Sequence, residues 1–597
     1  MAKKIPPIKY TDRDFASIRD SLVEYAKRYY PNTFKDFNEA SFGMMMLENV
    51  SYVGDILSFY TDYQANESFF ESAIEYQNVV RHARTLGYKF NTSPSSMGFL
   101  TFFIIVPAQT SGLGPNTNLI PLLKRGSEFA SSAGNVYVLI ENVDFSYANN
   151  EIVVARVNET TGVPTSYAIK ARGRAVSGKS EVSTFIIGEF QQFLKLEIGG
   201  TNISEIMQII DDEGHEYFEV EHLSQDIIFK EITNRNDDSD SVKSILKPVP
   251  VPRRFVIERE RDKTFIQFGY GSDSELSSLS IADPANVVLQ RHGRDFISDT
   301  SFDPTKILDT DKFGIAPSNT ILTILYRINT TENVNASIDS INDVRRPIFR
   351  FANLSSLNAG DVDFVMSSIE VTNEESFVGD VSIPSAEELK IRAKNYFVTQ
   401  KRAVTLQDYK SLSYNMPNQF GAIKRVNIVP DNNSFKRNLN MYIISENFSG
   451  QLINCNSTLK NNLKNWISTH KMVNDTIDIL NARVINFAIE FQVIGETNEN
   501  KYTILQRAIT ALKLKFINHY DIGEPIFISS IYNILNEVDG VEDTTDVRVY
   551  HKVGGQYSTT RFDFDKYLSA DGRVVRGFEN IIFELKFPND DIKGSII

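Results

Sequence analysis

The feature that most constrains this chain is a change in its hydrophobic spacing, which is helical at the start, strand-like in the middle and mixed afterwards. Helices repeat apolar residues every three or four positions, whereas half-buried strands alternate them. The chain has 597 residues and 42% apolar content, enough for roughly four domains of ~150 residues each. The sequence therefore predicts a multidomain α+β protein with an N-terminal helical segment, a β-rich middle and C-terminal α+β domains.

Residues 1–95 are predicted to form the N-terminal helical segment. The first helix is expected to start at Thr11 and Asp14, because a hydroxyl followed three positions later by a carboxylate is a helix-capping signal. A second amphipathic helix is predicted over residues 41–63, and a third over residues 72–86.

The β-rich middle is predicted as two lobes, residues 96–245 and residues 246–375. A polar run at 234–241 and the proline-rich stretch at 247–252 indicate an exposed loop or linker between them. The strand candidates are rich in β-branched and aromatic residues and are bounded by Gly, Asn, Asp or Pro. They are residues 99–106, 136–140, 152–157, 255–257, 264–268 and 320–328.

The C-terminal region, residues 376–597, opens with two helix starts in close succession. Ser385 with Glu388, and Thr405 with Asp408, each have the spacing of a capping residue and its acidic partner. Two helices separated by a short break are therefore expected.

Further along, the pattern mixes helices with a clear strand. Residues 485–493 alternate apolar and polar side chains, which predicts a strand with one buried face and one wet face. Residues 457–471 and 505–516 have helical spacing, and Ser529 is expected to cap a further short helix. These elements are typical of helices packed on a sheet.

Charge and cysteine content exclude several classes of protein. The formal charge of −14 and a pI near 5.2 argue against nucleic-acid binding, which needs clustered Lys and Arg. Cys455 is the only cysteine, so no intrachain disulfide is possible. Pro6 and Pro7 stand where a signal peptide would be apolar, and the longest strongly apolar run, residues 99–106, is too short to span a bilayer. A soluble protein without cofactor, metal or membrane insertion is expected.

The second helix carries more apolar side chains than a three-helix segment can bury. Either the middle domain or another chain should cover the surplus. Seven residues of the first two helices are therefore predicted as a partner interface: Phe15, Ile18, Leu22, Met46, Val50, Val53 and Leu57.

Several phrases, taken in order, resemble the baseplate J-like family, which includes the large wedge subunit of contractile-tailed, T4-like bacteriophage baseplates. The match spans roughly residues 120–550, and the number and order of the phrases carry it. They are LLKRGSEFASSAGNVYV at 122–138, FIQFGYGSD at 265–273, TILTILYRINTTENVNASIDSI at 320–341, RAVTLQDY at 402–409 and the closing helices and strands at 506–549. The runs YTDRDF at 10–15 and SYVGDILSFYTDYQANESF at 51–69 resemble the helical start of the wedge branch.

The resemblance implies a structural virion protein without catalysis, located in the phage tail baseplate and assembled in the host cytoplasm. It implies a wedge subunit that pairs with a second copy of itself and with other wedge proteins, forms a ring around the tail hub beside the sheath-initiator proteins, and rearranges to trigger sheath contraction. One departure is Tyr270, which lies between Gly269 and Gly271 where many members have another residue, so the turn is expected to differ locally.

Two other classes of function remain as alternatives. A tail-associated glycan hydrolase needs two facing carboxylates about 5 to 9.5 Å apart, and the densest acidic group, from Asp211 to Glu221, is interleaved with apolar residues as in a strand with one wet face. His215 and Glu216 begin like a zinc-protease motif, but Glu219 stands where the second His is required. A receptor- or glycan-binding tail protein could use the many aromatic residues, although their periodicity favours core and interface positions.

Overall fold

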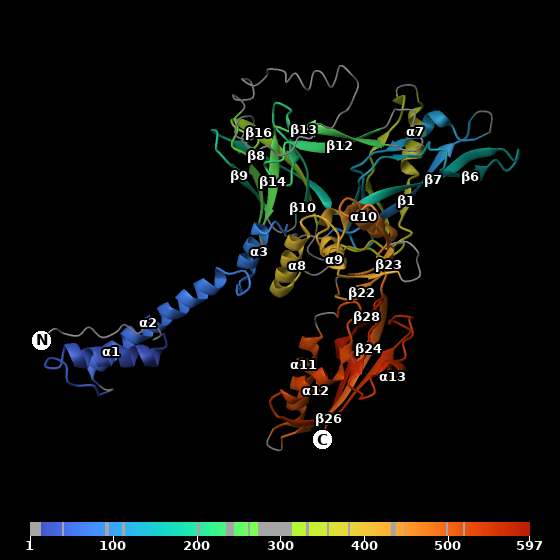
Figure 1. The fold of residues 1–597 in the computed structure, drawn as a ribbon. Helices are drawn as coiled ribbons and strands as arrows, with labels where there is room; N and C mark the ends of the chain where they lie inside the picture. The colour runs from blue at the N-terminus through green and yellow to red at the C-terminus, as the bar shows by residue number, and fades with distance from the viewer. Residues whose placement is uncertain are drawn as a thin grey trace. The chain divides into compact units, whose positions relative to one another are not determined.

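The computed structural model contains helices at the N-terminus, strands in the middle and both at the C-terminus, which confirms the predicted multidomain α+β class (Figure 1). The chain forms two compact units: residues 1–88 with 384–397, and residues 89–383 with 398–597. The structure describes residues 13–38, 41–89, 95–109, 114–199, 203–233, 244–260, 263–272, 313–329, 334–354, 357–379, 383–431, 438–447, 449–496, 499–516 and 520–597.

The helical unit contains α1 (Phe15–Tyr29), α2 (Phe42–Glu67), α3 (Tyr76–Thr85) and most of α8 (Ala386–Thr399). Asp14 caps α1 by accepting the Ser17 N–H at 3.2 Å, and Ser41 caps α2 by accepting the Met44 N–H at 3.2 Å. The predicted contribution of Thr11 lies outside the described residues. Side-chain oxygens at these positions satisfy N–H groups that the first helical turn leaves unpaired.

The segment 384–397 joins the N-terminal helices although it is some 300 residues away in sequence. The Tyr76 hydroxyl donates to the Pro384 carbonyl at 3.1 Å, and Lys390 Nζ donates to the Glu71 carbonyl at 2.8 Å. The rings of Tyr88 and Tyr396 meet edge to face, with centroids 5.9 Å apart. The fold therefore assigns this helix to the N-terminal unit, whereas its sequence position had placed it in the C-terminal region.

The other unit contains two seven-stranded sheets within its described ranges. The first has the order β17-β3-β4-β7-β1-β19, with β6 also paired to β7. Its strands are β1 (Met97–Pro107), β3 (Glu128–Ser131), β4 (Val136–Leu139), β6 (Glu151–Val157), β7 (Pro164–Ser177), β17 (Ile341–Arg346) and β19 (Glu370–Thr372). Helix α7 (Ala359–Ser367) packs on β1, and Phe102, Phe129 and Phe377 lie fully buried in the core beneath it.

The second large sheet has the order β8-β16-β10-β11-β14-β15-β9. Its strands are β8 (Lys179–Ile187), β9 (Lys195–Gly199), β10 (Ile203–Ile210), β11 (Glu216–Glu219), β14 (Arg254–Arg259), β15 (Thr264–Phe268) and β16 (Thr320–Ile328). After β15 the backbone passes so close to another loop that a Cβ on Gly269 would lie 2.0 Å from the Gly314 carbonyl oxygen, so only glycine fits. Tyr270 packs its ring against Phe193 and Phe313, at 5.1 and 5.9 Å between centroids.

Strand pairing crosses the predicted boundary between residues 245 and 246. Both large sheets combine strands from either side of it, and the boundary itself falls inside β13 (Ser244–Pro250), which pairs with β12 (Ile227–Thr233). The pairing therefore does not separate two lobes at that position. The stretch 247–250, which was predicted as loop or linker, is part of β13. Its prolines are tolerated because β12 and β13 form a two-stranded sheet, in which each strand is an edge strand. The predicted loop at 234–241 lies outside the described residues.

A small three-stranded sheet, β18 (Phe349–Arg350), β2 (Leu122–Leu123) and β5 (Val143–Asp144), completes the middle of the chain. The C-terminal part begins with α9 (Leu406–Tyr414) and α10 (Ser457–Ser468) beside β20 (Arg425–Pro430), β21 (Asn438–Glu446), β22 (Leu452–Ile453) and β23 (Thr476–Asn481). The Asp408 N–H donates to Thr405 Oγ1 at 3.2 Å, and the Thr405 N–H donates back to the Asp408 carboxylate at 2.8 Å. The predicted capping box is therefore confirmed.

The last sheet, β26-β24-β28 with β29 on β24, is covered by α11 and α12. Its elements are β24 (Arg483–Gly495), α11 (Lys501–Lys515), α12 (Ile528–Asn536), β26 (Val541–Lys552), β28 (Ile581–Glu584) and β29 (Ile592–Ile596). Shorter elements are β25 (Ile526–Phe527), α13 (Phe564–Tyr567), β27 (Val574–Val575) and α14 (Pro588–Asp591).

Two predictions in this region need correction. The alternation of β24 is incomplete, because Asn486 and Ala488 are buried on the face that was expected to be wet. Asn486 is tolerated there because its side chain donates to Glu584 at 2.7 Å and accepts the Ser558 N–H at 2.7 Å. Ser529 does not cap α12: the N-cap position is Phe527, without a side-chain hydrogen bond, and Ser529 lies inside the helix. The helix begins at Ile528, so Ser529 is its second residue, past the position from which a side chain can cap it.

Candidate interaction surface

Helix α2 has two faces, and α1 covers one of them. A Cβ on Gly54 would lie 3.3 Å from Ile18 Cδ1, and one on Gly43 would lie only 1.9 Å from the ring of Phe34. Met44 and Ser51 are buried on the same side of α2 as these glycines. Small residues at these positions allow α1 and the segment after it to approach α2 closely. Arg13, which lies just before the N-cap of α1, forms an exposed ion pair with Asp62 of α2 at 2.9 Å.

The opposite face of α2 is apolar and uncovered within the described residues. Its side chains recur at intervals of four, four, three, four and three positions, which places them on one stripe of a helix. The α2 stripe consists of Phe42, Met46, Val50, Val53, Leu57 and Tyr60, with exposed fractions of 70, 48, 56, 55, 60 and 59%. At 1.5 Å per residue it is about 27 Å long.

Further apolar side chains widen the stripe on one side. Met45, Tyr52 and Phe59 repeat at seven-residue intervals and are also exposed. The ring of Phe59 lies 5.9 Å from that of Tyr60 and stacks on that of Tyr63 at 6.2 Å. A helix that is apolar nearly all round is normally buried nearly all round. The exposed half of α2 therefore has the composition of a buried surface.

The charges of α2 are all acidic, and α2 contains no Lys or Arg. Glu48, Asp55 and Asp62 also repeat at seven-residue intervals and form a row on the flank between Met45, Tyr52 and Phe59 and the side covered by α1. The acidic row therefore lies on the far side of α2 from the stripe, and the stripe itself can bind an apolar helix face.

The structure does not bring the seven predicted interface residues into one surface. Phe15, Ile18 and Leu22 are half-buried on the face of α1 that meets α2, as the contact of Ile18 with Gly54 shows. The other four predicted residues, Met46, Val50, Val53 and Leu57, are exposed on the far side of α2.

Sequence reasoning missed both ends of the stripe. Phe42 lies four residues before Met46 and Tyr60 lies three residues after Leu57, so the same helical spacing of apolar residues predicts both. Gly43, Ser51 and Gly54 were the signal for the covered side, since small residues on one helix face mark a close neighbour.

The acidic group between Asp211 and Glu221 lies in a turn and a short strand. The His215 N–H donates to Asp211 Oδ1 at 2.7 Å, and His215 Nδ1 lies 3.1 Å from Asp211 Oδ2, so this pair closes the turn between β10 and β11. Glu216 and Glu219 begin and end β11, which is the strand that the alternation predicted. Among the described residues, no group of three His, Cys, Asp or Glu side chains is arranged to hold a metal ion.

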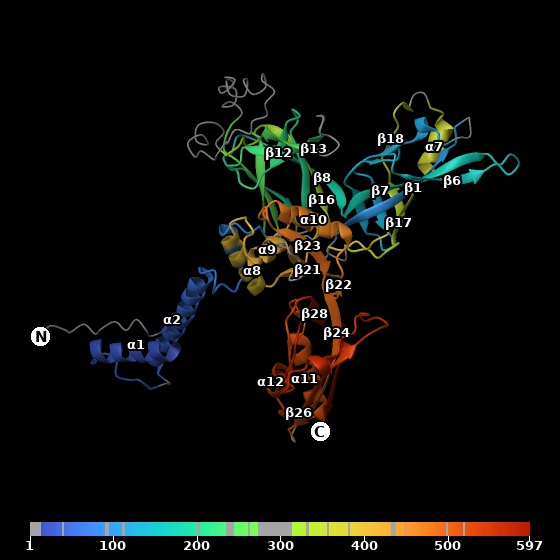
Figure 2. The same cartoon turned by 45° about the vertical axis from the view of Figure 1, so that its right-hand side comes forward.

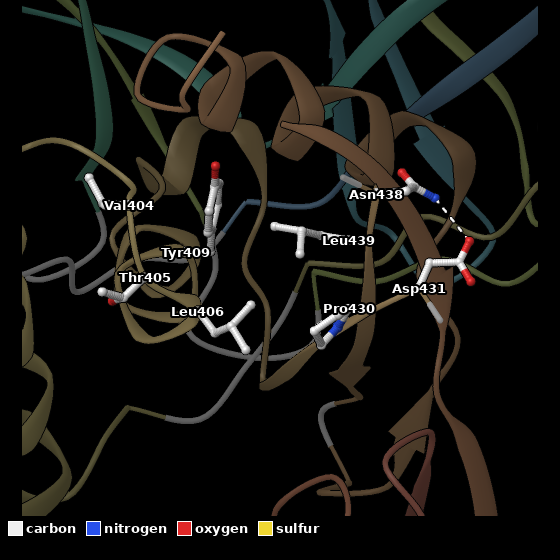
Figure 3. A pocket seen from close by; sticks show the side chains of 8 residues that line it. All are labelled: Val404, Thr405, Leu406, Tyr409, Pro430, Asp431, Asn438 and Leu439. Atoms are coloured by element: carbon white, nitrogen blue, oxygen red, sulfur yellow. Dashed lines mark hydrogen bonds between the residues drawn. The ribbon is translucent and has the colours of Figure 1, made fainter. Parts of the chain in front are cut away.

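A pocket of about 340 Å³ lies where the start of α9 meets the ends of β20 and β21 (Figure 3). It is lined by Val404, Thr405, Leu406, Tyr409, Pro430, Asp431, Asn438 and Leu439. The Tyr409 hydroxyl donates to Asp475 at 2.7 Å, and Asn438 Nδ2 donates to Asp431 at 3.3 Å. The Thr405 hydroxyl serves the capping box. These polar groups hold the local fold, and the remaining lining is mostly apolar.

The single cysteine is inert in this fold. Cys455 is 4% exposed, and burial raises the pKa of its thiol to about 12, so it stays protonated at neutral pH. A buried neutral thiol is a packing residue.

Comparison with known proteins bears on the helical unit. Residues 14–85 match the family model of the bacteriophage baseplate protein, N-terminal domain. The matched range runs from the N-cap of α1 to the last residue of α3 and includes the whole α2 stripe. The match supports a structural role in a baseplate. None of the curated proteins compared with the chain matches it.

Solved structures similar to the chain include two from baseplates. One is a chain of the anti-feeding prophage baseplate, symmetrised six-fold, at 9% identity, covering 95% of this chain and 90% of that one, with a TM-score of 0.25. The other belongs to the TssK-TssF-TssG baseplate subcomplex of the type VI secretion system, at 7% identity, covering 74% and 96%, with a TM-score of 0.23. Likeness at these TM-scores does not establish a common fold. Within the described residues, no helix combines the length and apolarity needed to cross a bilayer.

Proposed function

We propose that this chain is a baseplate wedge subunit of a contractile tail and that the α2 stripe docks on a helix of another baseplate protein. The observation that carries the proposal is that the segment matching the baseplate N-terminal domain bears a continuous apolar helix face with no cover in the described chain. Exposed apolar patches of this extent mark interaction sites in soluble proteins.

The expected partner is an amphipathic helix whose apolar face buries the α2 stripe. The acidic row Glu48, Asp55 and Asp62 lies on the far side of α2 from the stripe and takes no part in the contact. The helix is proposed to come from a different wedge protein.

The wider role follows the resemblance to the baseplate J-like family. The chain is proposed to pair with a second copy, to join other wedge proteins in a ring around the tail hub and sheath-initiator proteins, and to rearrange when the sheath contracts. Its place is the virion baseplate, after assembly in the host cytoplasm. Residues 376–597 are proposed to carry an α+β region with its own core, centred on β24.

The test is the double substitution Val53→Asp with Leu57→Asp in the full chain, co-expressed with the genes beside it. Burying two carboxylates at a contact without partners costs several kcal/mol. The variant should therefore fail to enter the complex on size exclusion while the isolated subunit melts like wild type. The matched control is Ile391→Asp with Val398→Asp on α8, where the side chains are 61 and 69% exposed. Complex formation at wild-type yield would refute docking by the α2 stripe, and a lower melting temperature of the subunit alone would assign the stripe to its own core.

A structural role without catalysis is also proposed. Replacing Glu216 and Glu219 with Gln changes exposed residues of β11, for which the usual cost is under ~0.5 kcal/mol. Particles carrying both changes should assemble and infect like wild type. Loss of infectivity from fully assembled particles would instead favour a hydrolase, and loss of host adsorption would favour a receptor- or glycan-binding role.

A further inference from the structure

The β6–β7 hairpin extends beyond the rest of its sheet (Figures 1 and 2). The second strand, β7, pairs along its length with β1, whereas β6 pairs only with the first half of β7. The turn is closed by Asn158, which donates its N–H to the Val163 carbonyl at 2.9 Å and accepts the Gly162 N–H at 2.8 Å. The outer edge of β6 therefore has no strand partner in the described part of the chain.

Both faces of β6 are apolar and exposed. Ile152 and Val154 are each 47% exposed, Val153 is 52% and Val157 is 49% exposed, and all seven residues of the strand are exposed. A β-branched strand with an open edge is a template for pairing with another chain unless something covers or blunts it. In β6 the only charges are Glu151 and Arg156, one near each end.

A bulge in β6 decides which residues share a face. Val154 lies opposite Tyr167, and Arg156 lies opposite the neighbouring Ser166, so Ala155 is the extra residue. Directly opposed residues point to the same side of a sheet. By this rule Glu151, Val153 and Arg156 lie on one face, because their partners in β7 are Lys170, Ala168 and Ser166. Ile152 and Val154 lie on the other face.

This order makes β6 complementary to itself. When two copies of β6 are laid antiparallel about Val153, with Ala155 kept as the extra residue of each strand, Glu151 of each copy faces Arg156 of the other, and Ile152 of each faces Val154 of the other. Every facing pair is on a common side of the sheet, as a two-fold axis through Val153 requires. No ion pair within the described residues involves Glu151 or Arg156, so both charges are available for the contact.

We propose that β6 of one chain pairs with β6 of a second copy, antiparallel and centred on Val153, so that the two hairpins continue one sheet. The pairing specifies the self-association included in the proposed function and rests on that function. One strand pair is a small interface, below the size of a stable protein complex, so the dimer forms at micromolar rather than nanomolar concentration. Other contacts in an assembled ring would strengthen it.

The test uses charge exchange in the full chain, measured by sedimentation velocity over a concentration series. The Val53→Asp, Leu57→Asp background silences the α2 stripe, so failure of the helix docking cannot imitate failure of the β6 pairing. Arg156→Glu alone and Glu151→Arg alone should each weaken the dimer about tenfold, because two attractive pairs become repulsive. Mixing the two single variants should restore a mixed dimer, because each then supplies the charge that the other lacks.

The mixing experiment separates loss of pairing from misfolding. A misfolded variant would stay unable to dimerise after mixing, whereas two folded variants with complementary charges would form a mixed dimer. A wild-type chain that stays monomeric at the highest concentration reached overturns the proposal, as do single variants that dimerise like wild type. Single variants that weaken the dimer without recovery on mixing overturn the register about Val153. If wild type alone is monomeric but β6 amides become protected from hydrogen exchange in a complex with neighbouring gene products, the occupant is a strand of another chain and the proposed self-pairing is wrong.

Discussion

Ile18 of α1 lies against Gly54 of α2, so closely that a Cβ on the glycine would be 3.3 Å from Ile18 Cδ1. This contact decides which half of α2 is covered and leaves the α2 stripe on the outside. Phe34 makes a closer contact of the same kind at Gly43, where a Cβ would lie 1.9 Å from its ring. The two glycines therefore place α1 and the segment after it on one side of α2.

The two glycines should respond differently to alanine. Gly43→Ala must displace the Phe34 ring, and overpacking of this kind costs about 1–3 kcal/mol, more than the gain of up to ~1 kcal/mol in helix propensity. Gly54→Ala needs only a shift of a few tenths of an ångström and should change stability by less than ~0.5 kcal/mol. Hydrogen exchange of the α1 amides measures the change in stability that each substitution causes. Faster exchange in Gly54→Ala than in Gly43→Ala would contradict the packing described here.

The turn between α2 and α3 should loosen in acid. The Glu67 carboxylate accepts hydrogen bonds from Asn78 Nδ2 at 2.8 Å and from the Ile74 N–H at 2.7 Å, and these bonds hold the pKa of Glu67 below its usual value. A pKa lowered in the folded state means that the carboxylate stabilises the fold above the unfolded pKa, and that this contribution is lost as pH falls through the folded pKa.

The measurement is urea unfolding of wild type and Glu67→Gln at several pH values. The variant should be less stable at pH 7, and the difference should shrink as the pH falls below about 4, since protonated Glu67 resembles Gln. A difference that is independent of pH would show that the carboxylate charge does not matter at this turn.

Thr405 and Ser529 offer a matched pair of capping tests. Thr405→Ala removes the Oγ1 acceptor of the capping box on α9, while the backbone N–H of residue 405 can still donate to Asp408, and the change should cost about 1 kcal/mol. Ser529→Ala lies inside α12 and should be neutral or slightly stabilising, because Ala is the better helix former. Chemical denaturation of the full chain compares them. An equal loss in both would restore Ser529 as a cap.

Cys455 should resist alkylation in the folded protein. Its burial and a pKa raised to about 12 leave almost no thiolate at pH 8, so modification by iodoacetamide should follow opening of the segment around β22 and α10. Mass spectrometry of the native and urea-unfolded protein measures the difference. Rapid labelling of the native protein would show that this region opens readily.

Local structure was largely predictable from the sequence. The capping box of Thr405 and Asp408 and the strand bounds of 264–268 and 320–328 agree with the structure, because hydrogen bonds between near neighbours and side-chain alternation depend on a few adjacent residues. The excess of apolar residues in α2 was also visible without a structure.

Contacts between distant segments were decided only by the tertiary structure. The segment 384–397 joins the N-terminal helices, far from its place in the sequence. Asn486 is buried because Glu584 and Ser558 satisfy its side chain. In the N-terminal unit, Ile18 faces α2 whereas Val53 and Leu57 face outward. Likewise, the open edge of β6 follows from the strand order and not from its composition. The sequence by itself determined which segments become helices and strands and how much apolar surface they carry. Which face of each is covered depended on the surfaces that the rest of the chain brings to it, because burial is a property of the neighbours and not of the residue alone.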